Sequence, residues 1–336
     1  MLNPQLHLNT KIFDKDVEQA PTRKGFGLGL LQAGTDNENI VALCSDLTES
    51  TQMHLFKEKF EKRFIEMGIA EQNMATVASG MAAMGKIPFM SSYAMFSPGR
   101  NWEQIRTAIC YNNRKVIIVG SHAGVSVGPD GGTHQAIEDI ALMRVIPNMT
   151  VVYPCDSVEA KKVTLASVYS RTPVYIRLAR EKSPIITTED TPFEIGKAQI
   201  LFVPDVGLAQ VGIIATGPLL SRALFAAKEL EKKGIRVKVM NLATIKPLDT
   251  KAIAELAREC KAIITVEEHQ IAGGMGSAIA EYLVGEYPVP MEFVGVADAF
   301  GQSGTQDELI AHYNLDTTNI VKAAEKVLER KSKIYQ

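Results

Sequence analysis

The chain has 336 residues, of which 46% are hydrophobic and 22% are charged, and its formal net charge is −2. This length indicates about two domains with buried cores, and so small a charge excludes recruitment of nucleic acid or of an anionic membrane by a global field. The N-terminal residues lack the apolar core of a signal peptide, and no apolar run is long enough to span a bilayer. The four cysteines show neither metal-ligand spacing nor a disulfide framework, so we expect a cytoplasmic protein.

The predicted elements of the first half alternate between short apolar β-branched runs and longer segments of helical period. Strands are expected at 39–45, 87–93, 115–121, 149–154 and 173–179, and helices at 71–85, 101–113, 134–145 and 157–170. Alternation of this kind predicts βαβ units and a largely parallel sheet. Because the strands are apolar throughout, we expect helices to cover both faces of that sheet.

The alternation breaks in a turn-rich, aperiodic stretch, where we place a linker at 191–208 with room for a hairpin. It then resumes, with strands expected at 211–217, 235–242, 262–269 and 291–298 and helices at 219–234, 250–260, 273–287 and 319–331. The sequence therefore predicts the α/β class. We expect two domains, 1–190 and 209–336, each a mostly parallel twisted sheet flanked by helices.

One loop, VGPDGGTHQAIED at 127–139, combines strong turn chemistry with a histidine. Thr133 is expected to cap a helix whose first residues include His134. The partial positive charge at a helix N-terminus disfavours imidazolium, so His134 would be a neutral imidazole able to exchange protons or bind a hydroxyl group. A capped turn without chemistry remains the alternative for the loop taken alone.

A second candidate is Glu71, which opens an apolar helix in the stretch GIAEQN at 68–73. The predicted buried stripe of that helix consists of Met74, Val77, Ala78 and Met81. A glutamate in a first turn usually only complements the helix dipole. Among apolar neighbours, however, its carboxyl group would be desolvated and could hold or share a proton at neutral pH.

In combination, GIAEQN, the aromatic segment SSYAMFSPGR at 91–100 and SHAGVSVGPDGGTHQ at 121–135 resemble the pyrimidine-binding domain of transketolases. The similarity runs in order from about Thr22 to Arg180, and the region after the linker resembles the C-terminal domain of the same family. The resemblance implies the fold of these domains and thiamine diphosphate as cofactor. The implied reaction transfers a two-carbon ketol unit from a ketose phosphate, such as xylulose 5-phosphate, to an aldose phosphate.

The resemblance also implies cofactor-binding residues. Glu71 matches the family's essential glutamate, a catalytic residue that hydrogen-bonds N1′ of the cofactor's aminopyrimidine and so promotes loss of the proton from thiazolium C2. The cofactor supplies the carbanion chemistry, while the protein supplies orientation and proton control. Tyr93 and Phe96 match the aromatic clamp around the pyrimidine, and Asp46 matches an acidic residue near the cofactor at the subunit interface.

The sequence departs from the family pattern at one position of the aromatic clamp. A tyrosine is expected three residues after Phe96, but Gly99 stands there. We expect Arg100 or Trp102 to fill the gap.

Further matches imply that the sugar phosphate binds to this chain. His134 resembles the catalytic histidine that faces the donor's hydroxyl group and the nascent carbonyl, and Asp130 resembles the aspartate that reads hydroxyl stereochemistry. Arginine suits phosphate because its planar fork makes paired, charge-assisted hydrogen bonds. The remaining implied substrate ligands, all for the phosphate end, are Arg23, Ser50, His122 and Arg180.

The chain lacks the Gly-Asp-Gly motif and later asparagine with which this family holds Mg²⁺ and the diphosphate. The Gly-Pro-Asp-Gly at 128–131 lies within the substrate loop, and we assign no metal ligand to this chain. We therefore expect Mg²⁺ and the diphosphate to bind to a separate chain. This chain would be the C-terminal subunit of a split transketolase, inactive alone and active in a heterotetramer with two copies of each chain.

Several alternatives remain open. A 1-deoxy-D-xylulose-5-phosphate synthase and the β subunit of the decarboxylating component of a 2-oxo-acid dehydrogenase share the fold and the glutamate. His122 and the GTHQ segment favour sugar phosphates over the latter. The glycines at 25–29 could indicate a dinucleotide site, although no strand precedes them. The glycines at 273–276 could bind phosphate at a helix start, and a non-catalytic subunit is a further possibility.

Overall fold

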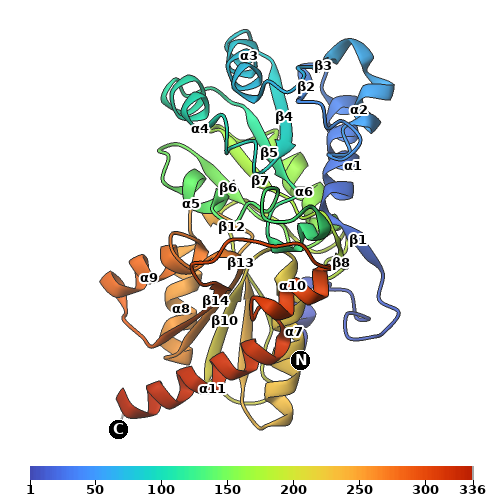
Figure 1. Cartoon of the computed structure of the whole chain (residues 1–336). Helices are drawn as coiled ribbons and strands as arrows, with labels where there is room; N and C mark the ends of the chain where they lie inside the picture. The colour runs from blue at the N-terminus through green and yellow to red at the C-terminus, as the bar shows by residue number, and fades with distance from the viewer. Residues whose placement is uncertain (335–336) are drawn as a thin grey trace.

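Two large twisted sheets with flanking helices organise the computed structural model, which describes residues 1–334 (Figure 1). A small third sheet pairs β1 (Gln19–Pro21) antiparallel with β8 (Lys182–Pro184). The first sheet has the spatial order β12-β6-β7-β5-β4-β2-β3. Its strands are β2 (Ile40–Cys44), β3 (Phe64–Glu66), β4 (Ile87–Tyr93), β5 (Ile117–Ser121), β6 (Thr150–Val152), β7 (Val174–Arg177) and β12 (Thr244–Lys246). All of its pairs are parallel except that between β12 and β6.

Helices cover both faces of this sheet, as its apolar strands predict. They are α1 (Thr22–Asp36), α2 (His54–Lys59), α3 (Glu71–Ala83), α4 (Trp102–Gln104), α5 (Asp139–Arg144) and α6 (Ser157–Ser167), with a π-helical stretch at Ile105–Tyr111. In β2, Ile40 and Ala42 pack in the core beneath α1 and α6. Val41 and Leu43 pack in the core beneath α3 and α5. The alternation of a strand's side chains thus fills two apolar layers.

The second sheet has the order β14-β13-β10-β11-β9, with all pairs parallel except that of β9 with β11. Its strands are β9 (Gln199–Phe202), β10 (Val211–Ala215), β11 (Val237–Asn241), β13 (Ile263–Gln270) and β14 (Met291–Val296). The accompanying helices are α7 (Leu220–Lys232), α8 (Thr250–Cys260), α9 (Met275–Glu286), α10 (Gln306–His312) and α11 (Thr317–Ile334). The fold is therefore the predicted α/β architecture.

The two halves exchange segments more than the sequence suggests. Strand β9 lies inside the stretch 191–208, which we expected to be a linker, and it is an edge strand of the second sheet. Conversely, β12 comes from the second half and pairs with β6 of the first sheet. At the N-terminus, Leu2 bridges Phe202, and Ile12 is buried in the second core. Edge strands recruit backbone partners from anywhere in the chain, so local composition does not reveal these pairings.

The glycines at 25–29 belong to helix packing. They lie in α1, where a Cβ at Gly25 would lie 1.8 Å from the carbonyl oxygen of Ser157 and one at Gly29 would lie 2.8 Å from Cβ of Thr164. Both contacts are with α6, so the missing side chains let the two helices approach closely. A short strand, β1 (Gln19–Pro21), does precede this run, contrary to expectation, but the glycines lie within α1 and form no phosphate-binding turn, so the dinucleotide alternative is wrong.

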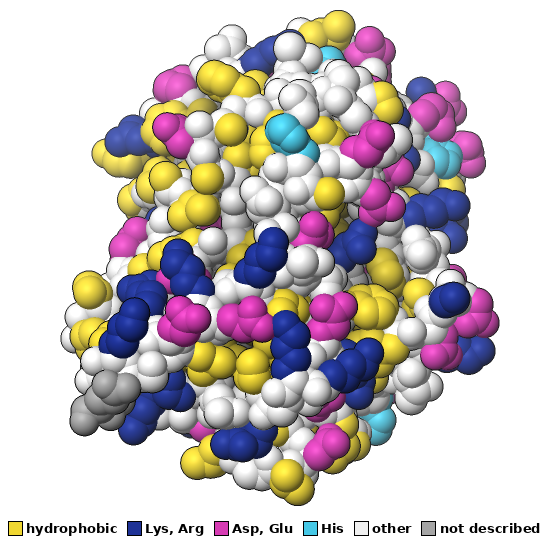
Figure 2. All heavy atoms as spheres, turned by 60° about the horizontal axis from the view of Figure 1, so that its bottom comes forward, with side chains coloured by type: hydrophobic (Ala, Val, Ile, Leu, Met, Phe, Trp, Pro, Cys, Tyr) yellow, Lys and Arg dark blue, Asp and Glu magenta, His cyan; other side chains and the backbone are white. Residues whose placement is uncertain are grey.

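One face of the molecule carries side chains of both charges. On the face shown in Figure 2, basic and acidic side chains are interspersed, in keeping with the net charge of −2. Within residues 1–334, no helix combines the length and apolar composition needed to cross a membrane.

Candidate active site

The predicted site residues lie at the carboxyl edge of the first sheet. In the parallel register, Cys44 of β2 is level with Ser91, and Tyr93 of β4 is level with Ser121. The strands therefore end side by side, and the loops that follow them meet at one edge. These loops carry Asp46, Phe96 and His122.

Glu71 is the first residue of α3, and its side chain is only 4% exposed. The sequence led us to expect only apolar groups around its carboxylate, but the structure shows a charged partner as well. Nη1 of Arg100 donates to both carboxylate oxygens, at 3.0 and 3.2 Å, and Nδ2 of Asn101 donates to the Glu71 carbonyl at 3.0 Å. A buried carboxylate is costly unless it is paired, and the guanidinium supplies that pairing.

A cavity of about 210 Å³ opens beside this carboxylate. Its lining consists of Ser45, Asp46, Leu47, Ile69, Glu71, Phe96 and Arg100. Asp46 is exposed and has a positive φ of 55°, and its backbone N–H donates to Oε1 of Glu66 at 2.8 Å. The cavity thus offers one buried carboxylate, one exposed carboxylate and one aromatic wall to a flat ring.

The departure at Gly99 has a packing reason. A Cβ at Gly99 would lie 1.9 Å from the Met95 carbonyl oxygen, so no aromatic side chain fits there. Trp102 turns away and donates from Nε1 to the Leu142 carbonyl at 2.8 Å. Arg100 instead fills the gap, with Cζ 4.2 Å from the centroid of the Phe96 ring.

Aromatic contacts connect this cavity to the predicted sugar-binding residues. The rings of Tyr93 and Phe96 are stacked with centroids 6.0 Å apart, and His122 stacks on Tyr93 at 3.9 Å. His134 meets Phe96 edge-on at 5.5 Å. Four aromatic side chains therefore form a continuous surface next to Glu71.

His122 is held in an unusual conformation at the end of β5. Its φ is 55°, in the left-handed region, and its Nδ1 lies 2.9 Å from Oγ of Ser121. Burial, followed by the positive charges of Arg23 and Arg180, lowers the pKa of His122 from 6.5 to about 3. The imidazole is therefore neutral near pH 7, and it can exchange hydrogen bonds with a ligand without carrying charge.

This low pKa predicts how His122 affects stability. Between pH 6.5 and about 3, the unfolded chain binds a proton here that the folded chain does not, so stability falls as the pH falls through that window. We test this with a His122→Asn variant, because asparagine tolerates the positive φ. On acidification from pH 7 to pH 5, the free energy of unfolding should fall less in this variant than in the wild type, by about 1 kcal/mol per pH unit. Urea unfolding at several pH values measures this, with exposed His7→Asn as control. Parallel curves for the wild type and His122→Asn would contradict the prediction.

Two guanidinium groups lie beyond His122. Nε of Arg23 donates to the Arg180 carbonyl at 3.2 Å, and its Nη1 donates to the Ser50 carbonyl at 2.8 Å. Arg180 donates from Nη1 to the Val127 carbonyl at 2.7 Å. Burial, followed by the positive charge of Arg180, lowers the pKa of Arg23. Within residues 1–334, Arg23 forms no ion pair with a carboxylate, so this position favours an anion from outside the chain.

The structure corrects the expected helix at 134–145. Residues 131–137 are not helical, and α5 begins only at Asp139, so His134 does not lie at a helix N-terminus. The backbone there pairs with another segment and cannot form a helix, because Ala136 forms a bridge with Ala123. The Gln135 side chain also donates to the carbonyls of Val125 and Gln302, at 2.8 and 3.0 Å. Tertiary contacts, and not a helix dipole, bring His134 to the aromatic surface.

Asp130 and Ser50 are the predicted site residues whose side chains make the fewest contacts with the rest of the site. Asp130 is exposed, and within residues 1–334 its side chain forms no hydrogen bond or ion pair that ties it to the cluster. Ser50 contributes its carbonyl to Arg23, whereas within residues 1–334 its side chain forms no hydrogen bond with another site residue. The structure therefore joins Glu71, the aromatic side chains and the arginines more closely than it joins these two.

A contact from the second half braces the substrate loop, and sequence reasoning missed it. Oε1 of Glu268, at the end of β13, accepts from the backbone N–H of Ser126 at 2.5 Å. A Cβ at Gly124, whose φ is 91°, would lie 2.3 Å from the same oxygen, which explains the glycine. No local pattern marks Glu268 as a loop partner, because the two residues lie 142 positions apart.

The glycines at 273–276 lie at a helix start whose backbone binds a carboxylate of this chain. The backbone N–H groups of Met275 and Gly276 donate to the carboxylate of Glu267, at 2.7 and 2.8 Å. The chain's own carboxylate therefore occupies the start of α9, where the alternative interpretation placed a phosphate. Across the part of the chain that the structure describes, no group of three or more His, Cys, Asp or Glu side chains is arranged to hold a metal ion.

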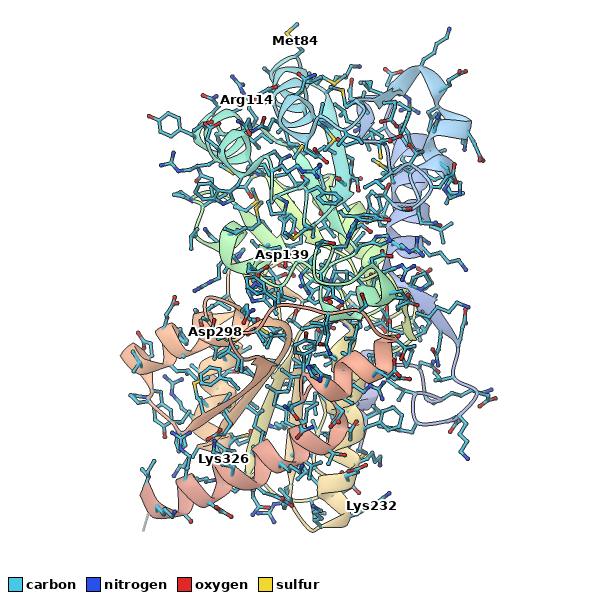
Figure 3. All side chains as sticks on the ribbon, in the orientation of Figure 1. Met84, Arg114, Asp139, Lys232, Asp298 and Lys326 are labelled. Carbon is cyan, nitrogen blue, oxygen red and sulfur yellow. The ribbon has the colours of Figure 1, made fainter. Side chains whose placement is uncertain are left out.

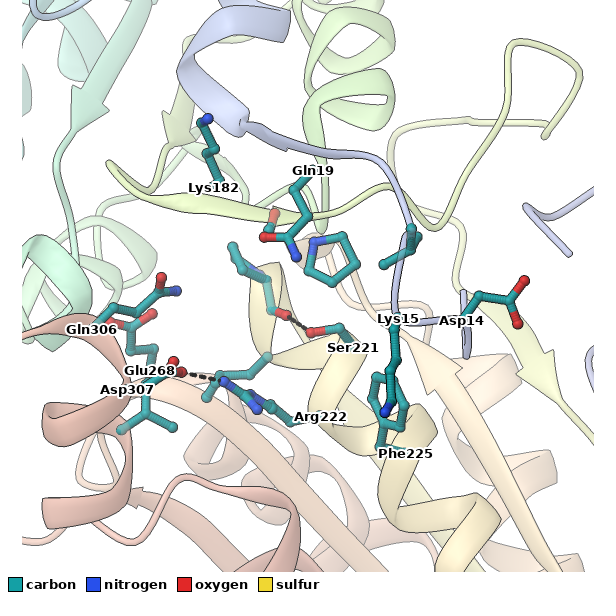
Figure 4. Close-up of a pocket in the computed structure, with 16 residues that line it drawn as sticks. Asp14, Lys15, Gln19, Lys182, Ser221, Arg222, Phe225, Glu268, Gln306 and Asp307 are labelled. Atoms are coloured by element: carbon teal, nitrogen blue, oxygen red, sulfur yellow. Dashed lines mark hydrogen bonds and ion pairs between the residues drawn. The ribbon is translucent and has the colours of Figure 1, made fainter. Parts of the chain in front are cut away.

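A separate cavity of about 270 Å³ lies where the two halves meet (Figure 4). It contains none of the predicted site residues. Arg222 on its wall is paired with Asp307 at 2.6 Å, and the side chains of Lys182 and Asp14 point away from its centre. Lys15 and Glu268 also line it, so charges of both signs lie on its wall and select no single ligand class.

A buried carboxylate, an aromatic wall and a pair of arginines at the carboxyl edge of a parallel sheet are typical of α/β proteins that bind an extended anionic ligand there. Comparison with known proteins identifies the family. Residues 18–185 match the transketolase pyrimidine-binding domain, and residues 205–320 match the transketolase C-terminal domain. The chain belongs to the transketolase family.

Its relatives include proteins of similar length and proteins twice as long. A subunit of a 6-deoxy-6-sulfo-D-fructose transketolase from Clostridium sp. (strain MSTE9) is 40% identical, over 95% of this chain and 98% of the relative. The solved structure of a split-gene transketolase, described as an inactive β4 tetramer, is 42% identical with a TM-score of 0.86, over 93% of this chain and 99% of the other. The transketolase of Rattus norvegicus is 38% identical over 94% of this chain, which spans only 49% of that protein.

Proposed function

We propose that this chain is the C-terminal subunit of a thiamine diphosphate-dependent transketolase. In this proposal, it transfers a two-carbon ketol unit from a ketose phosphate, such as xylulose 5-phosphate, to an aldose phosphate. The observation that supports it best is the continuous surface from Glu71, through Tyr93 and His122, to Arg23. Such a surface offers a proton-handling group at one end and a phosphate-binding group at the other.

The residues present suit the aminopyrimidine end of the cofactor. Glu71 would hydrogen-bond N1′ of the ring, Phe96 and Tyr93 would lie along it, and Asp46 would lie at its exposed side. When bound, the cofactor supplies a carbanion at its thiazolium carbon, which is the chemistry that side chains lack. Because Glu71 is buried, water does not compete for its carboxylate, and a proton held there stays at a defined atom.

The substrate would lie along the remaining surface. Neutral His122, whose Nδ1 faces Ser121, has Nε2 left to bond a sugar hydroxyl. His134, whose ring meets those of Tyr93 and Phe96 edge-on, would exchange a proton with the reacting oxygen. Arg23 and Arg180 would bind the phosphate, and Asp130, on the exposed loop, would meet a hydroxyl group of the sugar.

Diphosphate and Mg²⁺ would be bound by a separate subunit, in a cytoplasmic heterotetramer with two copies of each chain. The shared length with subunits of two-chain relatives supports this arrangement, as does the similarity to a chain described as an inactive tetramer. The test is to co-express this chain with a diphosphate-domain chain and to assay ketol transfer with Mg²⁺ and thiamine diphosphate. Activity of this chain alone would contradict the two-subunit proposal.

The donor is tested by comparing xylulose 5-phosphate, 6-deoxy-6-sulfo-D-fructose and pyruvate with the same complex. An arginine pair binds phosphate and sulfonate alike, so the two anionic sugars separate substrate preference within the family. Turnover of pyruvate, with glyceraldehyde 3-phosphate as acceptor, would favour a 1-deoxy-D-xylulose-5-phosphate synthase instead.

The phosphate-binding role of Arg180 gives a specific prediction. In an Arg180→Ala variant of the complex, we expect KM for xylulose 5-phosphate to rise by about 10- to 100-fold with a small change in kcat, because a charge-assisted pair of hydrogen bonds is lost from both ground and transition state. Unphosphorylated xylulose is the matched control, and its kinetics should be nearly unchanged. An equal loss with both sugars would show that Arg180 supports the loop and does not bind phosphate.

A further inference from the structure

Arg100 reaches from the surface onto the buried carboxylate. Its side chain is 49% exposed, whereas that of Glu71 is 4% exposed. Nη1 of Arg100 contacts both carboxylate oxygens, and within residues 1–334 no other side chain hydrogen-bonds them. The carboxylate that we assign to the cofactor is therefore already occupied by a residue of this chain.

The same guanidinium covers the aromatic wall. Cζ of Arg100 lies 4.2 Å from the centroid of the Phe96 ring, and both residues line the cavity beside Glu71. The backbone N–H of Arg100 donates to the Phe96 carbonyl at 2.9 Å. Together with the close packing of Gly99, this turn directs Arg100 toward the cavity. Arg100 thus blocks the hydrogen-bonding group and the stacking surface that a bound ring needs.

We propose that Arg100 is a displaceable counter-ion that stands in for the aminopyrimidine in the free chain. It neutralises Glu71 and covers Phe96 until the ring takes both positions, and its half-exposed side chain then moves into solvent. This proposal rests on the proposed function, because it takes the ring to be that of thiamine diphosphate. It assigns a role to the residue that replaces the missing aromatic side chain.

The proposal has a measurable consequence, because a ligand that displaces an internal ion pair binds more weakly than one that meets an open site. The complex with its partner subunit is titrated with thiamine diphosphate at saturating Mg²⁺ by isothermal titration calorimetry. Arg100→Ala and Arg100→Gln are each expected to bind the cofactor more tightly than the wild type, on the order of 10-fold. The matched control is Arg106→Ala, an exposed arginine nearby, which should leave the dissociation constant unchanged.

A Glu71→Gln background shows whether the effect passes through the carboxylate. There, Arg100→Ala should tighten binding much less, because no ion pair remains to be displaced and only the contact of Arg100 with the Phe96 ring is removed. Weaker binding by Arg100→Ala and Arg100→Gln, or equal tightening in both backgrounds, would overturn the proposal. A structure of the loaded complex should show Arg100 separated from Glu71, and a retained contact would overturn it as well.

The same titrations separate the two levels of inference. If Glu71→Gln weakens cofactor binding while Arg100→Ala fails to strengthen it, the counter-ion proposal fails and the proposed function stands. If the wild-type complex binds no thiamine diphosphate, both fail.

Discussion

A Glu71→Gln variant of the reconstituted complex is expected to lose ketol-transfer activity by about 100-fold or more, because general acid–base catalysis contributes on the order of 10²–10⁴. Glutamine keeps the size of the side chain and its ability to hydrogen-bond, but it cannot take up or release a proton. The position is buried and begins a helix, so the carboxylate acts from a fixed place. Steady-state rates with xylulose 5-phosphate measure the effect.

The matched control is Glu49→Gln, which makes the same change at a glutamate that is 82% exposed on the loop after β2. This variant should keep nearly full activity. The thermal unfolding of Glu71→Gln should stay close to that of the wild type, which would separate a catalytic loss from unfolding. Full activity of Glu71→Gln in the complex would instead favour a non-catalytic subunit.

An Arg177→Met variant is expected to lower the free energy of unfolding by about 3–5 kcal/mol, the usual cost of leaving one member of a buried ion pair without its partner. Arg177 and Asp139 have side chains that are 0% and 1% exposed, and Nε lies 2.8 Å from Oδ2. Asp139 lies at the junction of the two halves (Figure 3). Nη2 of Arg177 also donates to the carbonyls of Ala136 and Glu268, at 3.1 and 3.0 Å.

Urea unfolding measures this loss, and Arg171→Met is the control because Arg171 is exposed in the turn before the same strand. Adding Asp139→Asn to Arg177→Met should recover part of the lost stability, since no buried charge is then left unpaired. An additive double variant would argue against a direct pair. Because Arg177 holds the carbonyl of Ala136, we also expect the substrate loop to be more susceptible to protease in Arg177→Met.

Much of the fold could be predicted from the sequence. The apolar run at 87–93 coincides with β4, and the expected helix from residue 71 coincides with the start of α3. Both depend on side-chain periodicity, which neighbours in sequence establish. The polar loops after the strands also met at one edge, because parallel strands must end together. The family resemblance lay in these same loops.

Other features depended on partners far away in the chain. The turn chemistry around Thr133 predicted a helix start, but the backbone there forms a turn and a bridge from Ala136 to Ala123, and the Gln135 side chain is bound to Gln302, 167 positions away. Strand β12 joined the first sheet, although its sequence neighbours lie in the second. Likewise, Glu71 stood in an apolar stretch of sequence, whereas the folded chain brought Arg100 to it from 29 positions away.

By itself, the sequence determined the α/β alternation, the helix that begins with Glu71, and the order of the motifs along the chain. Each of these is encoded within a few residues, by periodicity and turn chemistry. Only the tertiary structure decided which side chain pairs with Glu71, how His134 reaches the aromatic surface, and which half supplies each edge strand. Those outcomes follow from the need of buried charges and backbone groups for hydrogen-bond partners, and such partners are chosen in space.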